Sequence, residues 1–127
     1  MMNERASVIT VGGEEYTLLL TTRATKEIAG RYGGLENLGE KLMKGENFEQ
    51  AIEEIVWLIT LLVNQPILIH NLRNPDNKKA LLTQDEMELL TNPADLSGYK
   101  TAIMEALNKG IKRHVESEAD TKNVVAG

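Results

Sequence analysis

Histidines, paired glutamates and a group of glycines are the residues of this chain whose types could support chemistry. A metal site at His70 would need a second histidine or a carboxylate at ligand spacing, and the sequence places none there. We therefore expect His70 to be a half-buried structural residue, and His114 to be a solvated charge at a helix end. The chain has no cysteine, which excludes disulfides, thiolate nucleophiles and cysteine-bound metals.

The glycines and glutamates do not form a catalytic pattern either. Gly30, Gly33 and Gly34 match the spacing of no phosphate-binding loop and predict a turn that ends a helix. Glu53 and Glu54 point about 100° apart on a helix, as expected of a solvated face rather than an acid–base pair. No serine lies in a nucleophile-elbow pattern. We therefore expect that the protein is not an enzyme and that it has no catalytic residue, bound metal or cofactor.

The composition is that of a soluble globular protein with one domain. The chain has 127 residues, of which 42% are hydrophobic and 26% charged, and its net charge is −5. This acidic balance argues against nucleic acid as a partner, because phosphate contacts require a basic face. The sequence MMNERASVITV has no apolar signal core, so a cytoplasmic protein is expected.

Residues 47–71 form the element that must organise the fold, because they contain the densest apolar run, at 55–63. Asn47 and Gln50 give a capping-box pattern at the start of a helix. Pro66 predicts an end or a kink near Asn64 or Gln65. The apolar run is about half of the roughly 20 residues that cross a bilayer, so no membrane is expected as a partner.

This helix should have two different halves. A polar stripe contains Glu49, Glu53, Thr60 and Asn64, and Trp57 interrupts it. From Trp57 to Leu68 the helix is apolar nearly all round, so it is either the core of a monomer or is covered by a partner. Both interpretations remain open. Our hypothesis is that Trp57, Leu61 and Leu68 border a surface that binds a partner helix or a second copy.

The remaining segments predict a mainly α (α+β) fold: an N-terminal β-hairpin, at about 7–20, and a small helical bundle around one long apolar helix. Gly12 and Gly13 join two β-prone runs through a tight turn, with Ile9 and Val11 on one face and Val8 on the other. An uncovered edge of this hairpin would be a site for strand addition. Residues 1–115 should form one domain, followed by a mobile tail at 116–127.

Helices are expected at 22–32, 35–43, 84–92 and 97–115, with a polar loop at 73–79. Ala24, Ile28 and Tyr32 predict the apolar face of the first helix, and Thr83 with Glu86 gives a capping box before the third. The pattern of the last helix consists of Tyr99, Ala102, Ile103, Ala106, Leu107 and Ile111.

The helices predicted at 22–32 and 35–43, joined by Gly33 and Gly34, are superficially similar to a helix-turn-helix. The second helix would present Glu36, Asn37, Glu40 and Lys41, which is a poor set for phosphates and bases. A small helix-turn-helix-like DNA-binding regulator is nevertheless kept as the alternative function.

Residues 9–43 resemble the N-terminal part of tail assembly chaperones from long-tailed phages and prophages. In the hairpin the matching residues are Ile9, Gly12, Gly13, Glu15, Tyr16, Leu18, Leu20 and Thr21. In the following helix they are Ala24, Lys26, Ile28, Tyr32 and Gly33. The apolar central helix and the closing segment before an acidic-leaning tail are also similar.

This resemblance implies a non-enzymatic role in virion morphogenesis. Such chaperones bind the long, aggregation-prone tape measure protein and keep it soluble in the bacterial cytoplasm until tail tube subunits polymerise around it. They are not expected in the finished virion. In many of these phages a frameshift makes a longer form, whose extension is thought to contact the tail tube protein. A second copy of the chain is a further expected partner.

Overall fold

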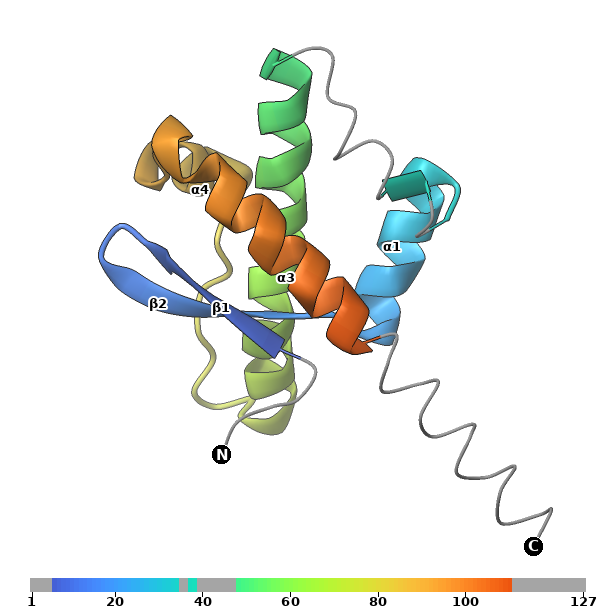
Figure 1. Cartoon of the computed structure of the whole chain (residues 1–127). Helices are drawn as coiled ribbons and strands as arrows, with labels where there is room; N and C mark the ends of the chain where they lie inside the picture. The colour runs from blue at the N-terminus through green and yellow to red at the C-terminus, as the bar shows by residue number, and fades with distance from the viewer. Residues whose placement is uncertain (1–5, 35–36, 39–47, 111–127) are drawn as a thin grey trace, which may run out of the picture.

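The computed structural model describes residues 6–34, 37–38 and 48–110. Within these residues the fold is mainly helical with an N-terminal antiparallel hairpin, which confirms the predicted fold class. The hairpin, α1 and α4 all contact helix α3 (Phe48–Arg73), which runs along the length of the molecule in Figure 1. The cap predicted at Asn47, His114 and the tail at 116–127 lie outside the described residues, as does most of the helix predicted at 35–43.

The hairpin consists of β1 (Ala6–Val11) and β2 (Glu14–Leu19). Gly12 and Gly13 have φ angles of 58° and 84°, which fit the tight primed turn that the sequence predicts. Ile9 and Val11 are 6% and 1% exposed, whereas Val8 is 57% exposed. The predicted assignment of the two strand faces is therefore confirmed.

Helix α1 (Thr22–Tyr32) begins after the N-cap residue Thr21, whose side chain also bonds to α3. The Thr21 hydroxyl accepts a hydrogen bond from the amide of Ala24 and donates one to the Gln65 side chain, which is buried. Gly33, with φ of 80°, ends the helix in the left-handed conformation. The predicted apolar face is buried and consists of Ala24, Ile28 and Tyr32.

The sequence predicts an end or a kink near Asn64 or Gln65. Helix α3 does not end there but continues through Pro66 to Arg73, so of the two only the end is wrong. Proline removes one backbone donor from this turn. The side-chain amide of Gln65 donates to the carbonyl of Leu61 at 3.0 Å and adds a hydrogen bond in the same region. Thr60, expected on the polar stripe, is instead 8% exposed and donates to the carbonyl of Val56.

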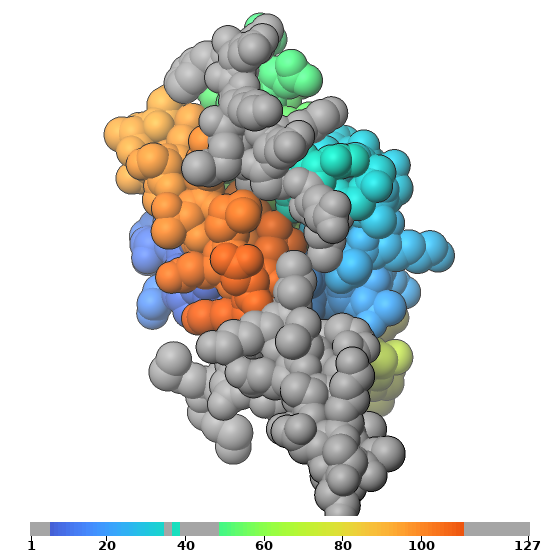
Figure 2. Space-filling view, turned by 45° about the vertical axis from the view of Figure 1, so that its right-hand side comes forward, coloured from blue at the N-terminus to red at the C-terminus, as the bar shows by residue number. Residues whose placement is uncertain are grey.

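The C-terminal elements of the described chain complete the hydrophobic core and pack beside the hairpin. Helix α4 (Gln84–Leu90) begins with the predicted capping box of Thr83 and Glu86, and η1 (Pro93–Asp95) leads into a helical segment at 96–110. That segment buries five residues of its predicted pattern, Tyr99, Ala102, Ile103, Ala106 and Leu107, whereas Ile111 lies outside the described residues. In Figure 2 it lies between the hairpin and α1.

Candidate partner-binding surface

Trp57, Leu61 and Leu68 lie on one face of α3, because their spacing keeps them within a narrow arc of the helix. All three side chains are half-buried. Leu72 follows on the same face and is 81% exposed. The sequence interpretation missed Leu72, although its spacing from Leu68 indicates a shared face. We call these four residues the α3 stripe.

Trp57 marks the end of the stripe that touches α1. The guanidinium of Arg31 lies 4.5 Å from the centre of the indole ring, close enough for a cation–π interaction. The ring of Tyr32 meets the indole edge to face, with centroids 6.1 Å apart. These contacts explain why a tryptophan interrupts the polar stripe: its ring forms part of the α1–α3 contact.

Glu54 joins the same contact. Its carboxylate accepts hydrogen bonds from Arg31 Nε at 3.1 Å and from the hydroxyl of Tyr32. Burial, and then the hydrogen bond to Glu54, raise the pKa of Tyr32 above its ordinary value. The phenol therefore stays protonated as a donor, and the aromatic end of the stripe is held rigidly against α1.

Asn64 and Asn71 lie beside the α3 stripe on the same helix. Their side chains bind the backbone of the segment 79–82, which follows α3 in the chain. The Asn64 amide donates to the carbonyl of Leu82 and accepts from its N–H, and Asn71 makes the same pair with Lys79. Two helical turns from Asn64 to Asn71 rise about 10.5 Å. Three extended residues from Lys79 to Leu82 span about 10 Å. The segment 79–82 is thus held along the helix through its backbone.

His70 anchors the turn before that segment. Its Nε2 lies 2.9 Å from the carbonyl oxygen of Asn77, and its Nδ1 lies 3.3 Å from the side-chain amide of Asn74. Both ring nitrogens therefore have polar partners, as expected for a structural histidine. Across 6–34, 37–38 and 48–110, no three histidine, aspartate or glutamate side chains gather as metal ligands would.

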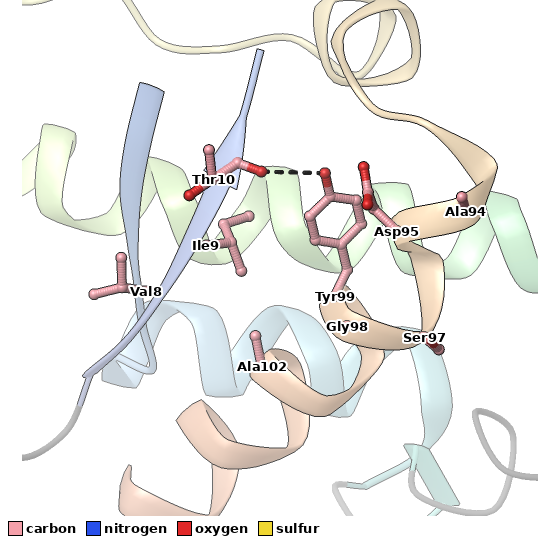
Figure 3. Close-up of a pocket in the computed structure, with 9 residues that line it drawn as sticks. All are labelled: Val8, Ile9, Thr10, Ala94, Asp95, Ser97, Gly98, Tyr99 and Ala102. Carbon is pink, nitrogen blue, oxygen red and sulfur yellow. Dashed lines mark hydrogen bonds between the residues drawn. The ribbon is translucent and has the colours of Figure 1, made fainter. Parts of the chain in front are cut away.

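A groove with a volume of about 560 Å³ separates β1 from the start of the segment 96–110 (Figure 3). The hydroxyl of Tyr99 crosses one end of the groove and donates to the carbonyl of Thr10 at 3.2 Å. The other lining residues are small or apolar apart from Asp95, Thr10 and Ser97. From the sequence, strand addition was expected if an edge of the hairpin stayed uncovered. The groove was not predicted, because it forms only when residues 94–102 fold back onto β1.

Helix α3 combines high hydropathy with incomplete burial. The stretch Glu49–Arg73 is long and apolar enough to cross a membrane, and 44% of its most apolar window is buried in the fold. Leu58, Ile59 and Leu62 are completely buried by protein, as in the core helix of a globular domain. The apolar surface that remains is concentrated in the second half of the helix, where residues 66–71 are only half-buried.

The chain was also compared with known proteins. No protein-family model, curated protein or solved structure matches it. Its function must therefore be argued from its own residues and surfaces.

Proposed function

We propose that this protein is a tail assembly chaperone of a phage or prophage, which binds the tape measure protein and keeps it soluble during tail morphogenesis. The observation that carries the proposal is the incompletely buried apolar surface of α3. The resemblance of residues 9–43 to this family supplies the identity of the client. A protein that holds an aggregation-prone chain needs an apolar surface available to it.

The α3 stripe has the organisation of such a surface. Its Trp57 end is fixed by α1, whereas Leu72 at the other end is open. One fully buried leucine contributes about 1.5–3 kcal/mol, so Leu68 and Leu72 together are enough to change affinity by orders of magnitude. The client segment is an apolar helix or strand laid along this face.

Two further partners belong to the proposal. A second copy of the chain would cover the same stripe in the absence of client. The tail tube protein would meet a longer, frameshifted form of the chain. The proposed site of action is the cytoplasm of the bacterial host, without nucleic acid or membrane as partners.

The DNA-binding alternative rests on a helix at 35–43, of which the structure describes only 37 and 38. No observation on the described residues favours this alternative. The chaperone proposal therefore remains the better supported of the two.

Co-purification of the tape measure protein with stripe variants tests the proposal. Leu72→Gln changes an 81% exposed side chain, and Leu89→Gln changes an 85% exposed one on α4, so both proteins should fold normally. Leu72→Gln should weaken binding about tenfold, corresponding to about 1.4 kcal/mol. Leu89→Gln is the matched control. Equal binding by the two variants and the wild type would exclude the stripe as the client site.

A further inference from the structure

The outer edge of β1 is only partly covered. In an antiparallel pair, alternate residues direct their backbone groups toward the partner strand and away from it. Val11 and Glu14 flank the two-residue turn and face each other, so Ser7, Ile9 and Val11 bond to β2. The amides and carbonyls of Ala6, Val8 and Thr10 therefore point away from the hairpin.

Two of these outward carbonyls already have donors from the segment 96–110. Lys109 Nζ donates to the Ala6 carbonyl at 3.0 Å, and the Tyr99 hydroxyl donates to that of Thr10. Between them lies Val8, and no described residue outside the hairpin is bonded to its amide or carbonyl. Val8 is also one of the residues that line the groove (Figure 3), so its outward peptide group lies beside that space.

We propose that an extended peptide segment of the client enters this groove and pairs with Val8 as a third strand. Only an extended chain offers a donor and an acceptor at the spacing of a strand edge. Among the described residues that line the groove, Asp95 alone has a carboxylate, so the segment carries a lysine or arginine beside its paired residue. The identity of the peptide's source rests on the proposed function.

A second copy of the chain does not fit as the occupant. Its own β1 would arrive with its own segment 96–110 alongside, because Ser7 Oγ is bonded to the Ala102 carbonyl at 2.8 Å. Two such helices would compete for the one space beside the edge. A single strand brings no second helix, and it pairs only at Val8, between the Lys109 and Tyr99 contacts.

Two substitutions block the groove by different means. Val8→Pro removes the outward N–H and leaves the ladder to β2 intact, as proline on a strand edge permits. Gly98→Phe places a bulky ring on a residue that lines the groove, and it should fold because a Cβ at Gly98 would meet no atom within 4 Å and the backbone there is helical. Thr17→Pro on the outer edge of β2 and Gly30→Phe on α1 are the matched controls.

The experiment measures binding of overlapping 12-residue peptides that span the tape measure protein, by fluorescence anisotropy, together with co-purification of the intact protein. A subset of basic peptides should bind the wild type and both controls, and should bind Val8→Pro and Gly98→Phe at least tenfold more weakly. If Val8→Pro does not fold, Gly98→Phe decides. The inference is overturned if the four variants bind equally. It is also overturned if no peptide binds while the intact protein still co-purifies, and the proposed function then stands. If neither binds, both fail.

Discussion

The side chain of Asn64 pairs with the backbone of Leu82 through two hydrogen bonds of 2.8 and 2.9 Å. Asn64→Ala leaves the amide and carbonyl of Leu82 without these partners in a partly buried setting, so the free energy of unfolding should fall by about 1–3 kcal/mol. Asn71→Ala removes the equivalent pair with exposed Lys79, where water can replace the amide, and should cost less than about 1 kcal/mol. Urea denaturation of both variants checks this. Equal losses would contradict the role given to Asn64.

Thr21 has two functions at the start of α1, as N-cap and as partner of the buried Gln65. Thr21→Ala loses the cap, which costs about 0.5–2 kcal/mol. It also leaves the oxygen of Gln65 without this donor, which costs about 1–3 kcal/mol. Thr21→Ser keeps the hydroxyl and should retain most of the stability. Thermal unfolding compares the two, and the prediction fails if serine is no better than alanine.

Tyr32 should make the stability depend on alkaline pH. Its folded pKa is raised above the ordinary value of 10.0 by burial and by Glu54, so the unfolded chain loses the phenolic proton first. This stabilisation is complete below pH 10 and is lost as the pH rises through the folded pKa. The difference in unfolding free energy between wild type and Tyr32→Phe should be constant up to about pH 9 and shrink above pH 10. Burial also raises the pKa of Tyr99, but Tyr99 is present in both proteins, so its effect cancels in the difference. A difference that grows above pH 10 would refute the assignment.

Gly98 and Gly110 should respond in opposite directions to alanine. Gly98 is helical with open space around it, so Gly98→Ala should raise the free energy of unfolding by about 0.4–1 kcal/mol. A Cβ at Gly110 would lie 2.7 Å from Leu20 Cδ2, so Gly110→Ala should cost about 1–3 kcal/mol through overpacking. Denaturant titration of both variants measures the signs. Two gains would show that the contact of Gly110 with Leu20 is not tight, and two losses would show that Gly98 does not have open space around it.

Local patterns predicted much of this fold because they act over a few residues. Gly12 and Gly13 specify the turn of the hairpin, and Thr83 with Glu86 specifies the start of α4. Alternation in β1 identified the faces of Val8 and Ile9. Pro66 predicted an end or a kink because local chemistry disfavours a helix there. The helix does not end, because the fold packed around α3 and the Gln65 bond to Leu61 support it.

The candidate surfaces were less predictable because they depend on contacts between distant segments. Trp57 was singled out from the stripe it interrupts, but its packing against Arg31 requires α1 to fold onto α3. The groove beside Val8 requires the Tyr99 hydroxyl to reach Thr10, far away in the sequence. No periodicity within one element encodes either arrangement.

The solubility of the tape measure protein, expressed alone or with this chain, tests the central claim most directly. The measurement is the soluble fraction of the tape measure protein after cell lysis, with the Leu72→Gln and Leu89→Gln chains expressed in parallel. The account predicts that the wild type and Leu89→Gln chains move the tape measure protein into the soluble fraction, and that Leu72→Gln does so markedly less. A tape measure protein that remains equally insoluble with and without the wild-type chain would contradict the account.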